Sequence, residues 1–184
     1  MLRSRLRISK VNAENLNPIY FIHITNWDDN KKQLKKIREQ VFIQEQNVPA
    51  ELEWDGLDEE AYHVLAEVNS IDEALASKRY PIGTARIIIN NKQAHIGRMA
   101  VLPEWRGKGV GSKILQCCID ECKKPFSKKN IETIVLNAQL YVTEFYQKAG
   151  FKITSEEFLD AGIPHKQMTL FLQAPAPKKK YKKD

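Results

Sequence analysis

The chain has 184 residues, of which 42% are hydrophobic and 28% charged, and its formal net charge is +6. This length supports one domain with a full core, and no stretch approaches the roughly 20 apolar residues that a membrane-spanning helix needs. The basic residues gather at the two ends, so the sequence between them is close to neutral. We therefore expect a basic N-terminal extension over 1–17, one folded domain over 18–174, and a disordered tail over 175–184 that is rich in proline and lysine.

The two ends and the cysteines bear on where the protein acts. The start, MLRSRLRISK, lacks the apolar segment of a secretory signal. Because it is rich in arginine and free of acids, targeting to an organelle stays an alternative. Cys117, Cys118 and Cys122 form no disulfide framework, because their number is odd and no second cluster exists. A reducing, cytoplasmic setting is the default expectation. No membrane partner is expected, and nucleic acid is at most a partner of the lysine tail.

The first half of the chain begins with a predicted strand at 18–25, rich in β-branched and aromatic residues. A helix follows at 28–46, with Leu34, Ile37 and Val41 on one face and with Asp28 or Asp29 helping to cap its start. Residues 47–60, NVPAELEWDGLDEE, then read as an acidic loop with a turn. Two interpretations of that loop remain open: it attracts a cationic amine, or it is merely solvated.

The second half alternates strands and helices. Strands are predicted at 61–68, 82–89 and 94–102, with a short helical turn within 72–78 and a tight hairpin at Asn90-Asn91. After the glycines near residue 109 come a helix to about Lys123, a strand at 131–138, a helix at 142–149 that Gly150 ends, and strands at 151–154 and 166–173. This order predicts a mixed α/β (α+β) fold with antiparallel and parallel strand pairs.

The glycine cluster Arg106-Gly107-Lys108-Gly109-Val110-Gly111 stands between a predicted strand and a predicted helix. A helix N-terminus offers free N–H groups and partial positive charge, and glycines let an anion approach the backbone. The stretch does not match a Walker A loop, and the dinucleotide fingerprint fails at Ser112. On these residues alone, a phosphate site and a plain tight turn both remain possible.

The same stretch fits the pattern [Q/R]-x-x-G-x-[G/A], and in its flanks, MAVLPEWRGKGVGSKIL, it resembles the acyl-CoA loop of the Gcn5-related N-acetyltransferases (GNAT). Downstream, VLNAQLYVTEFYQKAGF resembles the second motif of that family. Two further stretches, REQVFIQEQNVPAELEWDGLDEEAYHVLA and FLDAGIPHKQM, are similar to its ElaA-like branch. The resemblance spans about 38–168, most of the predicted domain.

The resemblance implies the GNAT fold: a mixed, mostly antiparallel twisted sheet with a splayed central parallel pair and helices on both faces. It implies acetyl-CoA as co-substrate and no metal. The pyrophosphate would be held by the loop, namely Arg106, Gly107, Lys108, Gly109, Val110 and Gly111. The strand before the loop would bind the pantetheine arm through Met99, Ala100 and Val101, and Asn137 would border the cleft from the second central strand.

Tyr146 occupies the position of the tyrosine that protonates the leaving thiolate in the family, although an aromatic packing role is the alternative. The family's usual glutamate on the strand before the loop is absent, because Gly97 and His95 stand at the two candidate positions. We expect Glu45 to serve as the general base. The alternatives are His95, His165 and His63, or an ordered water.

The resemblance thus predicts an N-acetyltransferase that moves acetyl directly from acetyl-CoA to an amine of a small molecule or peptide. The missing strand glutamate motivates an alternative, a catalytically silent module that senses acyl-CoA. A third possibility is a nucleic-acid-associated protein that binds through KKKYKKD. Cys118 and Cys122 are predicted to be core residues rather than metal ligands or nucleophiles. Either a monomer or a homodimer is compatible with the sequence.

Overall fold

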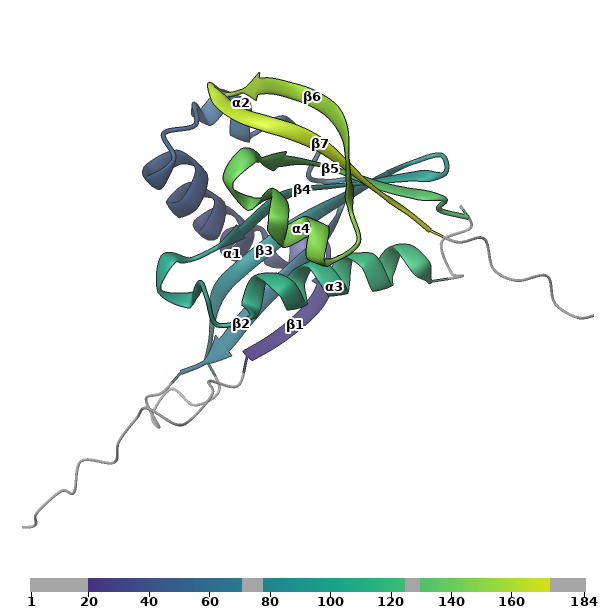
Figure 1. The fold of residues 1–184 in the computed structure, drawn as a ribbon. Helices are drawn as coiled ribbons and strands as arrows, with labels where there is room; N and C mark the ends of the chain where they lie inside the picture. Colours follow the sequence, from purple (N-terminus) through teal and green to yellow (C-terminus); the bar gives the residue numbers. More distant parts are fainter. Residues whose placement is uncertain (1–19, 71–77, 125–129, 173–184) are drawn as a thin grey trace, which may run out of the picture.

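A computed structural model describes residues 20–70, 78–124 and 130–172. Its centre is a seven-stranded sheet in the order β1-β2-β3-β4-β5-β7-β6 (Figure 1). The strands are β1 (Tyr20–Thr25), β2 (Tyr62–Asn69), β3 (Arg79–Asn90), β4 (Gln93–Val101), β5 (Thr133–Gln139), β6 (Lys152–Asp160) and β7 (Ile163–Phe171). The helices are α1 (Trp27–Arg38), α2 (Ala50–Glu53), α3 (Val110–Lys123) and α4 (Thr143–Lys148), with a π-helical turn η2 (Glu39–Glu45) after α1 and 3₁₀ turns at Pro103–Trp105 and Leu140–Val142.

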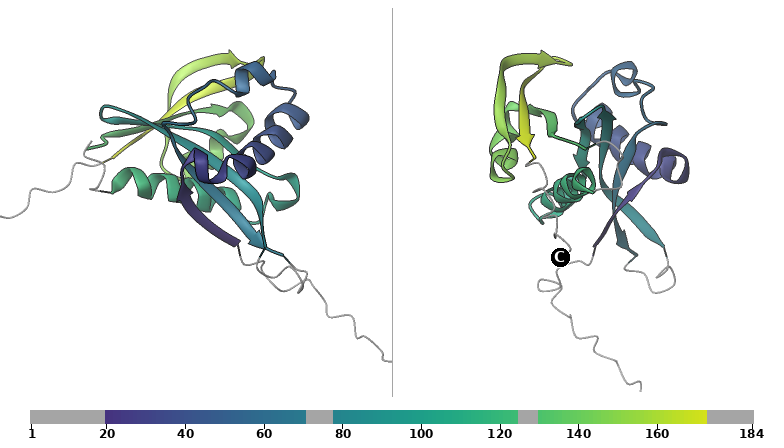
Figure 2. Two further views of the ribbon diagram at one scale, coloured as in Figure 1. Left: turned by 180° about the vertical axis from the view of Figure 1, so that it is seen from behind. Right: turned by 90° about the vertical axis from the view of Figure 1, so that its right-hand side faces the viewer.

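Helices cover both faces of the sheet (Figure 2). The amphipathic α3 packs on one face, where Ile114 and Leu115 are buried together with Ile87 and Ile134 from the sheet. On the other face α1 buries Leu34 and related residues against the sheet, and the members of this second core are Trp27, Leu34, Ile37, Val41, Leu65, Ala100 and Leu102. The predicted apolar face of the first helix is therefore confirmed. No helix of the described ranges is long and apolar enough to cross a membrane.

One pair of neighbouring strands, β4 and β5, is parallel, and all other pairs in the sheet are antiparallel. The parallel pairing ends at His95 and Val135, while β4 continues to Val101 and β5 to Gln139. Beyond His95 the two strands separate, and one edge of β4 has no partner strand among the described residues. The mixed sheet with a splayed central parallel pair is thus confirmed.

A β-bulge interrupts β4 just before its end. Gly97 pairs with Arg86 and Ala100 pairs with Thr84, so β4 carries one residue more than β3 over this interval. Arg98 adopts a left-handed backbone with φ of 51°, which is uncommon for a residue with a side chain. The bulge resets the alternation, so that Ala100 joins the α1-side core while Met99 packs with the α3-side core.

The first helix differs from the prediction in its last turns. Its N-cap residue is Asn26, whose Oδ1 accepts a hydrogen bond from the Asp29 N–H at 2.9 Å. Asp29 helps to cap the start, as predicted, because its Oδ2 accepts a hydrogen bond from Asn26 Nδ2 at 2.8 Å. Regular α-helix ends at Arg38, and the π-helical η2 continues the element to Glu45. The sequence could not predict the change from α-helical to π-helical hydrogen bonding, because the spacing of the apolar residues does not record it. Val41 lies on the apolar face whichever of the two helix types is formed.

Further differences concern lengths and turns. The predicted loop at 47–60 contains the short helix α2. The strand predicted at 151–154 is the start of the longer β6, which turns into β7 at Ala161-Gly162, where φ is 49° and 77°. The β3–β4 hairpin turns at Asn91-Lys92, one residue later than predicted, because Asn90 still pairs with Gln93. The predictions for 1–17, for 175–184 and for most of 72–78 concern residues outside the described ranges.

Candidate functional site

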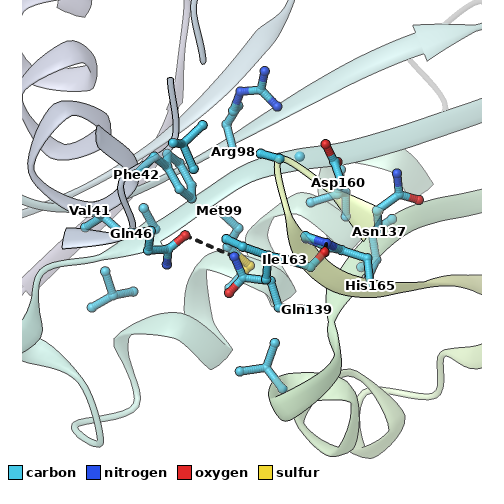
Figure 3. A pocket seen from close by; sticks show the side chains of 18 of the residues that line it. Val41, Phe42, Gln46, Arg98, Met99, Asn137, Gln139, Asp160, Ile163 and His165 are labelled. Atoms are coloured by element: carbon cyan, nitrogen blue, oxygen red, sulfur yellow. Dashed lines mark hydrogen bonds between the residues drawn. The ribbon is translucent and has the colours of Figure 1, made fainter. Parts of the chain in front are cut away.

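A cavity of about 530 Å³ opens where β4 and β5 separate. One wall comes from η2 and the chain after it, through Val41, Phe42 and Gln46, and the opposite wall comes from β5 and the β6–β7 hairpin, through Asn137, Asp160 and His165 (Figure 3). Met99 lies between the two walls (Figure 3). The cavity extends along β4 to Arg106 and Gly107, so it connects the hairpin with the glycine cluster.

The glycine cluster forms a turn that leads directly into α3. Gly107 and Gly109 have φ of 72° and 79°, a conformation that side chains disfavour, and a Cβ at Gly107 would meet no atom within 4 Å. Gly109 is the N-cap of α3 and supplies no side-chain acceptor, so the first N–H groups of the helix stay available to a ligand. These features fit a pyrophosphate. The cavity lining itself includes Arg106 and Gly107 but none of Lys108, Gly109, Val110 or Gly111.

Arg106 ties the glycine turn to η2. Its Nη1 and Nη2 donate to the two carboxylate oxygens of Glu45 at 2.7 and 2.6 Å, and its Nε donates to the Val101 carbonyl at 2.9 Å. The hydrogen bond from Arg106 lowers the pKa of Glu45 below its usual value. Glu45 is not among the residues that line the cavity. A carboxylate held in this way is a weaker proton acceptor than a free one.

Tyr146 lines the cavity from α4. Its hydroxyl lies 3.6 Å from the sulfur of Met99, on the strand before the glycine turn. Edge-to-face contacts with Phe145 and Phe151 hold the ring. Burial is the largest cause that raises the pKa of Tyr146 well above its ordinary value. The phenol therefore keeps its proton at neutral pH and can act as a proton donor.

His95 lines the same cavity at the residue where β4 and β5 part. Gly97, two residues on, has no side chain, and a Cβ there would lie 3.7 Å from His95 Nδ1. Burial lowers the pKa of His95, and the charges of Arg86 and Arg98 lower it further. The imidazole is therefore neutral at physiological pH and is able to accept a proton.

The other two candidate histidines, His165 and His63, occupy different surroundings. His165 lines the cavity from β7, where its Nδ1 is 2.8 Å from the Ile163 carbonyl and its ring stacks on Phe158. His63 is buried outside the cavity lining, with its Nε2 2.9 Å from the Asp58 carbonyl, and burial lowers its pKa. The structure thus brings His95, His165 and Tyr146 to one cavity and places His63 elsewhere.

Six charged side chains form an ion-pair network beneath one end of the cavity. Arg38 contacts Glu53 and, at 2.6 Å, Asp58, and Arg86 contacts Asp58 at 2.9 Å. Asp55 completes the network through Arg86 at 2.6 Å and through Arg98, the bulge residue, at 3.0 Å. Three of the six acids of the predicted loop, Glu53, Asp55 and Asp58, are therefore neutralised by three arginines. The side chains of Glu51, Glu59 and Glu60 are exposed, as the solvated interpretation expects, and the attraction of a cationic amine stays a prediction.

Several residues of the cavity escaped sequence reasoning. They are Phe42, Gln46, Arg98, Gln139 and Asp160. Gln139 donates from Nε2 to Gln46 Oε1 at 3.0 Å and so links the two walls (Figure 3). Phe42 and Gln46 fall within REQVFIQEQNVPAELEWDGLDEEAYHVLA, Gln139 within VLNAQLYVTEFYQKAGF, and Asp160 within FLDAGIPHKQM. Membership of these stretches does not identify a residue as lining a cavity.

The cysteines lie in the core as predicted. Cys118 and Cys122 are buried on α3, and burial raises the pKa of the Cys122 thiol to about 12. A protonated, enclosed thiol is a poor nucleophile. Within the described residues no three His, Cys, Asp or Glu side chains are grouped to hold a metal ion. The expectation of a metal-free reaction remains a prediction.

Comparisons with known proteins agree on one family. The model of the acetyltransferase (GNAT) domain matches residues 28–172. YjcF of Bacillus subtilis, described as an uncharacterized N-acetyltransferase, is 37% identical over 143 residues, covering 76% of this chain and 93% of YjcF. Protein ElaA of Escherichia coli is 31% identical over 136 residues, covering 72% of this chain and 81% of ElaA.

Solved structures show the same fold. The crystal structure of Escherichia coli ElaA has a TM-score of 0.67 and 25% identity, covering 82% of this chain and 99% of that one. An acyl-CoA N-acyltransferase from Pseudomonas aeruginosa also has a TM-score of 0.67, with 22% identity over 82% of this chain and 99% of its own. The predicted fold class and the resemblance to this family are both confirmed.

Proposed function

Since the chain belongs to the GNAT acetyltransferase family, we propose that it moves an acetyl group directly from acetyl-CoA to the amine of a small molecule or peptide. The observation that carries the proposal is the continuous cavity from the glycine turn at Gly107, along the unpaired edge of β4, to the phenol of Tyr146. One cavity is then shared by both substrates, as direct transfer requires.

The residues of β4 and the glycine turn fit acetyl-CoA. The thioester supplies the activated acetyl group. The N–H groups of residues 107–111 at the start of α3 would hold its pyrophosphate, with Arg106 beside them. The free edge of β4 at Met99, Ala100 and Val101 would hydrogen-bond the amides of the pantetheine arm in the manner of an added strand. Asn137 would border the arm from β5.

Two side chains would move protons. The acceptor amine must lose a proton to attack, and His95 is neutral and lines the cavity, so it would accept that proton, directly or through a water. Tyr146 keeps its proton at neutral pH, so it would donate to the departing sulfur. Glu45, the expected base, is better suited to hold Arg106, because both of its oxygens are engaged there. His165 stays a second candidate base, since it lines the same cavity.

The substitution Tyr146→Phe tests the assignment of the acid. We expect kcat to fall by about a hundredfold or more, which lies within the range of general acid catalysis, while the affinity for acetyl-CoA stays unchanged. Thiol release from acetyl-CoA gives kcat, and calorimetry gives the affinity. Tyr62→Phe is the control, since it removes an exposed hydroxyl outside the cavity lining. An unaltered kcat in Tyr146→Phe would show that this tyrosine only packs.

A further inference from the structure

The charged side chains that line the cavity differ in whether they have a partner. They are Glu53, Arg98, Arg106 and Asp160. Arg98 Nε contacts Glu53 at 2.9 Å, and Arg106 is held by Glu45. The Asp160 carboxylate makes no hydrogen bond or ion pair with any described residue. It is an exposed residue, and it is the one lining charge that the described part of the chain leaves unpaired.

Asp160 lies at the end of a strand, where an aspartate side chain often stabilises the turn that follows. It ends β6, directly before the turn residues Ala161 and Gly162. An aspartate at such a place commonly accepts a hydrogen bond from a backbone N–H of its own turn. Here the side chain accepts none from the described residues and instead lines the cavity beside His165 and Asn137 (Figure 3). The turn thus leaves the carboxylate open to a ligand.

The rest of the acceptor side is uncharged or neutralised. The wall across from Asp160 presents Phe42, Val48 and Leu52, and the amides of Gln46 and Gln139 bond each other. Both lining arginines already face carboxylates. An acceptor with its own carboxylate would find no free cation among the described residues that line the cavity, and it would meet Asp160 as a like charge.

The reacting amine is a poor partner for Asp160, because a carboxylate beside an ammonium favours the protonated form, which cannot attack. A second positive charge on the acceptor has no such conflict, since it stays protonated throughout. We propose, on the basis of the acetyl transfer proposed above, that the acceptor is a cationic amine without a carboxylate, whose second positive group pairs with Asp160. Diamines and polyamines belong to this class.

The test compares matched acceptors at two chain lengths, four and six carbons. Each set holds a diamine, the monoamine and the amino acid, for example putrescine, butylamine and γ-aminobutyrate. Thiol release gives kcat/KM for the native chain, for Asp160→Asn, and for Glu156→Gln, which removes an exposed acid of β6 outside the cavity lining. Calorimetry with the CoA-loaded protein measures diamine binding independently of turnover.

We expect the diamine to be the best acceptor and the amino acid the poorest. Asp160→Asn should lower kcat/KM for the diamine by about two- to fivefold, the range of an exposed ion pair, and leave the monoamine unchanged. Glu156→Gln should change neither.

The inference is overturned if the diamine has no advantage over the monoamine, if its advantage survives Asp160→Asn, or if the CoA-loaded protein neither binds nor acetylates it. Each of these results leaves acetyl-CoA binding intact and so spares the proposed cavity. A protein that binds no acetyl-CoA and releases no thiol with any acceptor would instead overturn the proposed function itself.

Discussion

Replacing Glu45 by glutamine separates two roles for this residue. Glutamine keeps the size of the side chain but turns the doubly hydrogen-bonded ion pair with Arg106 into a neutral contact. The two side chains are 37% and 44% exposed, so solvent screens their attraction. We expect the substitution to remove about 0.5–1 kcal/mol of interaction free energy between the two side chains, which is typical of an exposed ion pair. A general base removed in the same way would cost about a hundred- to ten-thousandfold in rate.

The expected signature is a change in acetyl-CoA affinity without loss of chemistry. Loss of the pair frees Arg106 and the glycine turn, so KM for acetyl-CoA should rise about two- to fivefold while kcat stays near its native value. Initial rates of thiol release at saturating acceptor give both parameters. Glu39→Gln is the control, because it removes an acid of η2 that is not paired with Arg106.

A double substitution sharpens the test. If Glu45 acts only through Arg106, Glu45→Gln should add nothing in the Arg106→Gln background, since the interaction is already gone. A hundredfold fall in kcat with unchanged acetyl-CoA affinity would refute this reasoning and restore Glu45 as the base. Additive effects of the two substitutions would refute the coupling.

Two further predictions concern protons and stability. The substitution His95→Gln should lower kcat at least tenfold. In the native protein kcat/KM should fall as the pH drops below the usual histidine pKa, because the pKa of His95 lies below that value, and the substitution should remove this fall. A pH profile of His95→Gln that keeps the fall would exclude His95 as the base. The substitution Asp58→Asn should destabilise the fold by about 3–5 kcal/mol in urea at neutral pH, because Arg38 and Arg86 lose a buried partner. Burial raises the pKa of Asp58, but Arg38 and Arg86 outweigh it and hold the pKa below its usual value, so this stability is present above the unfolded pKa and is lost as pH falls through the folded one. An equal loss at neutral pH and at pH values below the folded pKa would contradict the ion-pair explanation.

The sequence predicted the element order because each element carries a local signal. Leu34 and Ile37 mark a helix face, β-branched runs mark the strands, and Gly150 marks a helix end. No local signal predicts the left-handed backbone conformation of Arg98, because contacts with a segment distant in the sequence stabilise it. Its Nη2 donates to the Leu52 carbonyl at 2.9 Å, and Leu52 stands 46 residues earlier in the chain.

The site was predictable to the extent that its residues belong to contiguous motifs. The turn at Gly107 and the phenol of Tyr146 were found in this way, and both line the cavity. Partners in space were not predictable, since nothing local distinguishes Glu53, which arginines neutralise, from Asp160, which stays unpaired among the described residues. The role of Glu45 depends on the same kind of information, namely the position of Arg106 on a distant turn.

The most direct test of the proposed reaction is the stoichiometry of transfer. The protein is mixed with acetyl-CoA and putrescine, free thiol is titrated, and acetylated amine is counted by mass spectrometry. Direct transfer predicts that acetyl-CoA binds without an acceptor, that no thiol is released until the amine is added, and that each thiol then corresponds to one acetylamine. The proposal is contradicted if acetyl-CoA does not bind, or if it binds and thiol appears without acetylated amine.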